Sequence, residues 1–159
     1  MSFGWSKTVL AGGSFDILNV GHVKFLGRCK NLGNVLIVGV ANDEDIEERK
    51  GSLRPIIPAK QRAEIVAALQ PVDYVFISYL SAYNDKILKL IKPNILAIPL
   101  ESGKVSKRKK RKKEIELRFP FIRVKLIDQT KEKVHSTAII KKIVKKYSAN
   151  SNEKCESEK

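Results

Sequence analysis

The stretch from Val9 to Leu26 constrains the fold of this 159-residue chain more than any other part of it. It begins as an apolar run, passes through the pair Gly12 and Gly13, and takes up helical spacing from Val23 onward. This order predicts a strand, a tight loop and a helix. Parallel α/β sheets bind phosphates with that arrangement.

Several residues of this stretch suit an anionic ligand. Gly12 and Gly13 allow close approach to the backbone, and Ser14 offers a hydroxyl and an N–H. The helix that follows presents the positive end of its dipole, and His22 in its first turn adds a titratable imidazole. We therefore predict a phosphate site between Gly12 and His22.

Apolar segments and helical patterns alternate along the rest of the chain. Strands are predicted at 8–11, 34–40, 74–77, 95–98 and 122–127, and helices at 20–30, 44–50, 58–69, 84–91 and 136–147. Strands separated by single helices form right-handed βαβ units, so we predict an α/β fold with a doubly wound, five-stranded parallel sheet. One domain is expected over residues 1–147, followed by a polar, disordered tail at 148–159.

The net charge of +14 predicts an anionic partner, whether a nucleotide, a phosphorylated metabolite, a nucleic acid or a lipid head group. No apolar run approaches the roughly 20 residues of a membrane span, and no leader is apparent, so a cytoplasmic location is expected. Cys29 and Cys155 have neither the number nor the spacing for a disulfide framework or a zinc site.

Gly-Gly-Ser-Phe-Asp at 12–16, followed by Asn-Val-Gly-His at 19–22, resembles the signature of the cytidylyltransferase-like nucleotidyltransferases. That signature is a Gly-x-Phe-Asp loop followed by His-x-Gly-His, and Asn19 stands where the first His belongs. The resemblance implies a Rossmann-like sheet with the nucleotide over the point where strand order reverses. It implies catalytic roles for Asn19 and His22, and nucleotide contacts from Gly12, Gly13, Ser14, Phe15, Asp16 and Gly21.

Other interpretations of these residues stay open. Asn19 can donate a hydrogen bond but no charge, which implies slower catalysis or a shifted role. Asp16 can cap or orient the loop in place of binding magnesium, and Phe15 is most simply a core residue. His22 can be a packed residue at a helix start, although the surrounding motif favours a functional role.

Two later segments extend the resemblance. Residues 50–75 resemble heptose-phosphate adenylyltransferases, glycerol-phosphate cytidylyltransferases and archaeal FAD synthetases, which implies that Lys50, as a catalytic residue, and Arg62 lie near the phosphates. Residues 134–140 resemble an Ile-Ser-Thr-Ser/Thr-x-x-Ile motif, in which Ser136 and Thr137 cap a helix and bind the nucleotide. Three nearby residues are left as solvated or open: Arg54 and Lys60 are expected to be solvated, and His135 either reaches the phosphates or faces water.

Two segments depart from the family pattern. Residues 99–103 replace a Gly-x-Asp type segment, which affects what can be inferred about base or acceptor recognition. Residues 104–113 form a basic insert that can be a lid over the phosphates, an anchor on RNA or an anionic membrane, or a solvated loop. Charge runs of this kind are usually disordered when unbound, and few aromatic residues are present for base stacking.

Together these features predict a nucleotidyltransferase. It would move CMP or AMP from CTP or ATP, with substrate-bound Mg²⁺ and no protein-held metal, onto a phosphorylated polyol or sugar such as glycerol 3-phosphate, and release pyrophosphate. FMN is the competing acceptor, and a catalytically weakened nucleotide-binding protein that docks on RNA or membrane through residues 104–113 is the alternative from another class. The resemblance also implies a homodimer.

Overall fold

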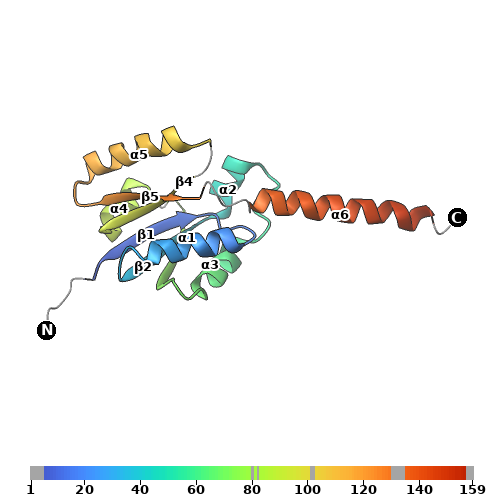
Figure 1. The fold of residues 1–159 in the computed structure, drawn as a ribbon, viewed down its shortest axis with the longest axis horizontal. Helices are drawn as coiled ribbons and strands as arrows, with labels where there is room; N and C mark the ends of the chain where they lie inside the picture. Colours follow the sequence, from blue (N-terminus) through green and yellow to red (C-terminus); the bar gives the residue numbers. More distant parts are fainter. Residues whose placement is uncertain (1–5, 80, 82, 101–102, 130–134, 157–159) are drawn as a thin grey trace.

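The computed structural model describes residues 6–79, 81, 83–100, 103–129 and 135–156, which are arranged as Figure 1 shows. Their strands and helices follow in the order β1 (Thr8–Gly13), α1 (Val20–Lys30), β2 (Val35–Ala41), α2 (Asp43–Lys50), α3 (Ala59–Ala67), β3 (Tyr74–Ser78), α4 (Asp85–Ile91), β4 (Ile95–Leu100), α5 (Val105–Arg118), β5 (Arg123–Asp128) and α6 (Ser136–Glu156). The predicted strands and helices are confirmed to within a few residues. The exceptions are residues 104–113 and the tail after residue 147, which are described below.

The five strands of the described residues run parallel in one sheet, in the spatial order β3-β2-β1-β4-β5. The chain builds outward from β1 through β2 to β3, and then crosses back so that β4 pairs with the other side of β1. Strand order therefore reverses between β1 and β4, which is where sheets of this kind bind ligands. The predicted Rossmann-like, doubly wound sheet in a single domain is confirmed.

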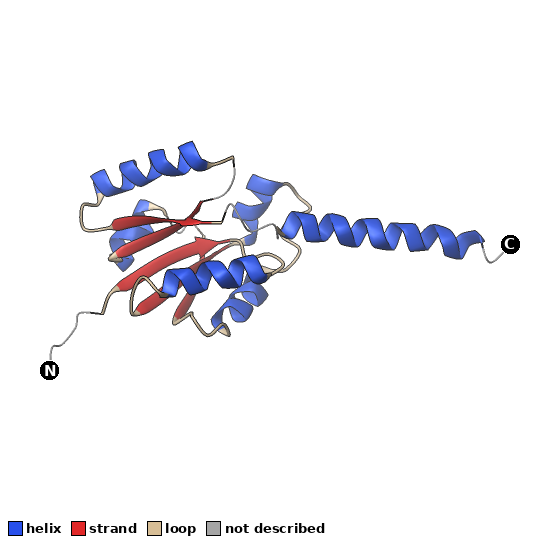
Figure 2. Cartoon of the chain, viewed as in Figure 1, coloured by secondary structure: helices blue, strands red, loops and turns tan. Residues whose placement is uncertain are grey.

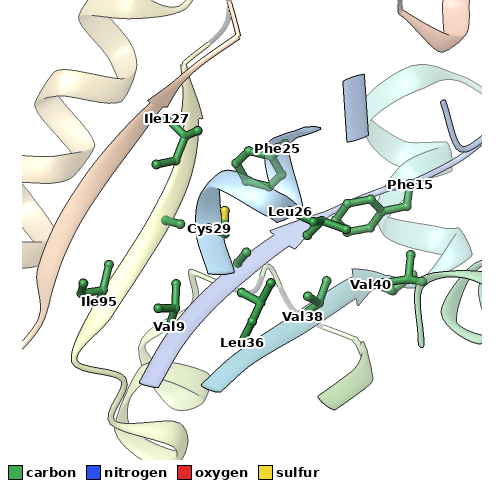
Figure 3. Packing of buried hydrophobic residues seen from close by; sticks show 13 residues of the cluster. Val9, Phe15, Phe25, Leu26, Cys29, Leu36, Val38, Val40, Ile95 and Ile127 are labelled. Atoms are coloured by element: carbon green, nitrogen blue, oxygen red, sulfur yellow. The ribbon is translucent and has the colours of Figure 1, made fainter. Parts of the chain in front are cut away.

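Helices cover both faces of the sheet (Figure 2). On one face, Phe25 of α1 and Val66 of α3 pack with Val9 in the buried cluster of Figure 3. On the other face, Leu88 of α4 and Ile115 of α5 belong to a second buried cluster. Strands covered on both faces are apolar without alternation, which explains the continuous apolar runs of β1, β2 and β4.

The basic insert at 104–113, predicted to lack regular structure, instead begins helix α5. Lys and Arg are good helix formers, so the run itself opposes a helix only through its charge. Ile115 and Phe119, which follow the run, are buried against the sheet. Tertiary packing of these apolar residues stabilises the helix, as it does most helices in proteins.

Of the tail predicted at 148–159, residues 148–156 continue helix α6 to Glu156, and residues 157–159 lie outside the described residues. Once a helix is nucleated, each further residue adds one backbone hydrogen bond, so a polar segment can extend it. In Figure 1, α6 projects away from the sheet and carries the C-terminus with it. Among the described residues we find no helix whose length and apolar character would suit a membrane-spanning segment.

Candidate active site

A cavity of about 390 Å³ opens at the carboxyl ends of β1 and β4, where strand order reverses. The first turns of α1 and α6 and the adjoining ends of α2 and α5 complete its wall. Its lining consists of Gly12, Gly13, Ser14, Phe15, Asn19, Gly21, His22, Phe25, Lys50, Arg54, Pro99, Lys104, Gln129, His135, Ser136 and Thr137. Most of the predicted site residues thus meet in one place.

A larger hollow of about 600 Å³ lies at the opposite edge of the sheet, near the amino ends of β4 and β5. Lys7, Asn94 and Arg123 help to line it, and none of the predicted site residues does. Ligands of doubly wound sheets bind at the carboxyl ends of the strands. The smaller cavity is therefore the candidate active site.

Asn19 caps the start of α1. Its Oδ1 accepts a hydrogen bond from the N–H of Gly21 at 3.0 Å, and its backbone N–H donates to Nδ1 of His22 at 3.2 Å. Its side-chain Nδ2 donates to the carbonyl of Ile17 at 3.1 Å. Asn19 lines the cavity, but these bonds hold the loop and the helix start together, so its shifted role is that of a cap.

The same bonds determine how His22 presents its ring. Because Nδ1 accepts the N–H of Asn19, the proton of the neutral ring lies on Nε2. Burial is the main cause of a pKa lowered to about 4, the charge of Lys50 and the nearby His135 act in the same direction, and Asp16 acts against them. At neutral pH, His22 is therefore a neutral donor on the cavity wall.

Lys50 is the last residue of α2 and brings a cation to the loop that follows β1. Its Nζ donates to Oγ of Ser14 at 3.1 Å. Gly51 comes next with a φ of 92°, a conformation that ends the helix and that a residue with a side chain rarely adopts. Lys50 and Ser14 therefore lie together on the cavity wall, as predicted.

The first turn of α6 forms another part of the wall. Oγ of Ser136 donates to the carbonyl of Asp16 at 2.6 Å, which ties α6 to the loop after β1. Thr137 and His135 also line the cavity, so His135 faces the site rather than bulk water alone. N–H groups in the first turn of a helix lack intrahelical partners and suit an anion.

Asp16 is only 1% exposed and does not line the cavity. Its carboxylate accepts the N–H groups of Ile56 and Ile57, both at 3.1 Å to Oδ1, and the Nε of Arg54 at 2.6 Å. Burial alone would raise the pKa of this carboxyl, but these three donors together lower it below the ordinary value. Asp16 thus orients the loop that carries Arg54, as one of its two interpretations expects, and its contact with the nucleotide stays a prediction.

Arg62 is also 1% exposed and lies outside the cavity wall. Its guanidinium donates to the carbonyls of Ser14 and Ile57, at 2.5 and 2.7 Å, and to Oδ1 of Asp43 at 2.5 Å. All three bonds hold neighbouring loops in place beneath the cavity. Arg62 thus has a structural role, which its helical position alone does not reveal, and its contact with a phosphate stays a prediction.

The loop after β1 is held in an uncommon backbone conformation. Phe15 and Ile17 have φ values of 49° and 51°, and a β-branched residue pays about 1–3 kcal/mol for this region. The ring of Phe15 folds back so far that a side chain on Gly13 would approach it to 3.0 Å. Phe15 thus forms a buried floor of the cavity, and a side chain on Gly13 would crowd its ring.

Arg54 and Gln129 line the cavity although the sequence did not assign them to it, Lys104 lines it as the lid interpretation of residues 104–113 allows, and Tyr83 contacts its wall. The hydroxyl of Tyr83 donates to the carbonyl of Gly12 at 3.1 Å, and Gln129 directly follows β5. The rule that ligands lie at the carboxyl ends of strands would have pointed to Gln129 and to Lys104, which follow β5 and β4. No local pattern distinguishes Tyr83 or Arg54.

Within the described residues no group of three or more His, Cys, Asp or Glu side chains could hold a metal ion. Asp16, the acidic residue of the loop, already accepts three donors. No Asp or Glu is among the described residues that line the cavity, whereas Mg²⁺ in phosphate-transfer sites is usually held by one or two carboxylates together with substrate phosphates.

Comparison with known proteins agrees with this geometry. Residues 10–143 match the Cytidylyltransferase-like family. The chain is 39% identical over 140 residues to the FAD synthase of Thermococcus sibiricus, covering 87% of this chain and 93% of that protein. It is 46% identical over 90 residues to the Bifunctional protein HldE of Nitratiruptor, covering 57% of this chain but only 19% of that longer protein.

Solved structures give the same result for the fold. A lipopolysaccharide core biosynthesis protein from Thermoplasma volcanium superposes with a TM-score of 0.60 at 28% identity, covering 78% of this chain and 96% of that one. Pantoate-beta-alanine ligase from Francisella tularensis, at 15% identity and a TM-score of 0.53, shares the fold alone; the match covers 80% of this chain and 61% of that one.

Proposed function

The chain belongs to the Cytidylyltransferase-like family and is a nucleotidyltransferase, and on that premise we propose that it transfers AMP from ATP to the phosphate of a small phosphorylated polyol or sugar. The observation that carries the proposal is the convergence of His22, Lys50 and the first turns of α1 and α6 on one cavity. Cations and the positive ends of helices in such a place suit a triphosphate. CTP is the competing donor.

The reaction joins two anions. An oxygen of the acceptor phosphate forms a bond to the α-phosphorus, the bond from that phosphorus to the bridging oxygen breaks, and pyrophosphate leaves with the electron pair. The attacking oxygen is already an anion, so no strong base is needed. The protein contributes position and stabilisation of charge on the phosphate oxygens.

His22 is the residue to which we assign the central role. Its neutral ring donates from Nε2 to a phosphate oxygen, and the polyanion raises the pKa of the ring, so that the hydrogen bond becomes charge-assisted as charge develops. Lys50 offers a cation on the same wall. Mg²⁺ enters as part of the substrate, bound by the triphosphate.

FMN is a second candidate acceptor, favoured by the FAD synthase relatives, which this chain matches over most of its length. FMN carries its phosphate at the end of a ribityl chain, so it is itself a phosphorylated polyol. The two candidate acceptors share the reacting phosphate and differ only in the group to which that phosphate is attached.

We also propose a cytoplasmic homodimer. The buried, free Cys29 is typical of a reducing compartment. Ile143, Val144 and Tyr147 on α6 are about half exposed or more, which suits helix packing against a second copy. Light scattering on the purified protein tests the dimer, and a monomer at micromolar concentration would contradict it.

The activity is tested by measuring pyrophosphate release with ATP or CTP against a panel of glycerol 3-phosphate, a heptose phosphate and FMN. We expect release with ATP and one acceptor, in proportion to the nucleotidylated product seen by mass spectrometry. Release with CTP alone would correct the donor, and no release from folded protein with any pair would contradict the proposal.

A further inference from the structure

One face of α5 changes character along its length. At 100° per residue, Lys104, Arg108, Arg111 and Ile115 lie within about 60° of one another around the helix axis. Ile115 is fully buried and Phe119, one turn later, is 4% exposed, so this face is the one turned toward the sheet. The sheet-facing side is therefore apolar in the second half of the helix and cationic in the first half.

The two arginines on this face are held partly inside the protein. Nε of Arg108 and Nε of Arg111 are buried, and neither has a hydrogen-bond partner among the described residues. Four lysines of the same segment, Lys107, Lys109, Lys110 and Lys113, are exposed. A solvated loop or a purely external basic surface would not require cations on the inner face. Buried, unpartnered N–H groups are unfavourable unless something binds them.

Two of these cations, Lys104 and Arg111, connect to the active-site cavity. Lys104 lines it directly. The guanidinium of Arg111 lies 5.5 Å from the ring centre of Tyr83, whose hydroxyl donates to the carbonyl of Gly12 at 3.1 Å. Gly12 is itself part of the cavity wall, so the cationic half of α5 lies next to the site that the nucleotide would occupy.

The position of α5 relative to α1 determines which substrate it would meet. The two helices cover opposite faces of the sheet, so they approach the carboxyl edge from opposite sides. In-line displacement requires the attacking oxygen and the leaving pyrophosphate to lie on opposite sides of the α-phosphorus. His22 and Lys50 supply donors on the α1 side, so an anionic attacker needs its own cations on the other.

We propose that Lys104, Arg108 and Arg111 form a subsite for the phosphate of the acceptor, on the α5 side of the cavity. This inference rests on the proposed function and names how the second substrate is bound. The planar guanidinium suits the task, because it binds phosphate oxygens in pairs. The subsite orients the acceptor oxygen toward the α-phosphorus and offsets the repulsion between two polyanions.

Steady-state kinetics of Arg108→Gln and Arg111→Gln test the subsite, with ATP and the acceptor varied separately. We expect the KM for the acceptor to rise about 10- to 100-fold, as loss of a charged hydrogen bond produces, with the KM for ATP within about twofold. Lys109→Gln and Lys113→Gln remove exposed charges of the same helix and should change neither constant. Thermal melting confirms that each variant is folded.

Three outcomes would overturn the subsite. The first is an unchanged acceptor KM in both arginine variants. The second is an equal rise in the KM for ATP, which would mean that the cations hold the triphosphate. The third is an equal rise in the acceptor KM in the exposed lysine variants, which would mean that the net charge of the helix causes the effect and not a specific subsite.

Binding measurements separate failure of the subsite from failure of the proposed function. Calorimetry with FMN and with glycerol 3-phosphate, each in the presence of a non-hydrolysable ATP analogue, needs no turnover. Binding by the wild-type protein that weakens at least tenfold in Arg111→Gln supports the subsite even if no pyrophosphate is released. Equal binding by both proteins, or no binding of either acceptor by the wild type, overturns it.

Discussion

Two sets of polar residues meet at the loop after β1, and they differ in what they face. His22 and Lys50 line the cavity, whereas Asp16 and Arg62 lie beneath it with almost no exposed surface. The sequence resemblance assigns all four to the substrate site. The difference shows that a motif contains both the residues that meet the ligand and the residues that hold those residues in place.

The buried set has a clear physical task. The loop contains two residues at positive φ, an unfavourable conformation that persists only because contacts with neighbouring residues stabilise it. Asp16 accepts donors from the loop at residues 54–57, and Arg62 donates to the carbonyl of Ser14. We expect the cavity residues to control turnover and the buried residues to control stability.

The largest effect is expected from Arg62→Met. Removal of the guanidinium leaves the carbonyls of Ser14 and Ile57 and the carboxylate of Asp43 without their donor, which should lower the free energy of unfolding by about 3 kcal/mol or more. Chemical denaturation measures the loss, and the exposed Lys60→Met on the same helix should be near neutral. A stable Arg62→Met protein with a raised KM for ATP would return Arg62 to the nucleotide site.

The next effect is a pH dependence of stability from His22. Its pKa is lowered to about 4 in the folded protein, from an ordinary value of 6.5. Between these values the unfolded chain binds a proton that the native state does not, so stability falls as the pH drops from 6.5 toward 4, by about 3 kcal/mol in total.

Denaturation curves at several pH values test this dependence, with His22→Gln as the control because an amide does not titrate. The variant should lose most of the slope between pH 6.5 and 4. An identical slope in both proteins would mean that His22 is not held neutral. The lowered pKa of Asp16 acts in a different window, because stability from that carboxylate is lost only as the pH falls below about 3.8.

Much of this architecture can be predicted from the sequence, for reasons that the structure makes plain. Continuous apolar runs at β1, β2 and β4 identify strands covered on both faces, and the helix at 20–30 follows from its spacing and its glycine-rich start. The cavity residues near Gly12, His22 and Ser136 follow from helix starts at the carboxyl edge. These features are local, so a local pattern suffices.

The remainder depends on contacts between distant residues. Arg62 and Asp16 are polar residues whose side-chain partners lie up to 48 and 41 positions away. No local pattern distinguishes a buried structural residue of this kind from a phosphate ligand. Helix α5 forms because Ile115 and Phe119 pack on the sheet, although the preceding charge run suggests disorder. Local composition does not predict structure where tertiary packing overrides it.

His22→Ala removes an imidazole from the cavity wall. Loss of a donor to the phosphate oxygens should lower turnover about 100-fold or more, with a smaller change in stability than Arg62→Met produces. Val23→Ala, at the next position of α1 and outside the cavity wall, should leave turnover within about twofold. Unchanged turnover in His22→Ala would remove this residue from the mechanism.

The smallest effect is expected at Asn19, which belongs to both sets because it lines the cavity and caps α1. If its task is the cap, Asn19→Ala lowers the free energy of unfolding by about 1 kcal/mol, Asn19→Ser retains most of it, and turnover changes far less than in His22→Ala. Thermal melting and turnover measured on the same preparations separate the two roles. A loss of turnover as large as that of His22→Ala, at unchanged stability, would place the Asn19 amide on a phosphate and move this residue to the cavity set.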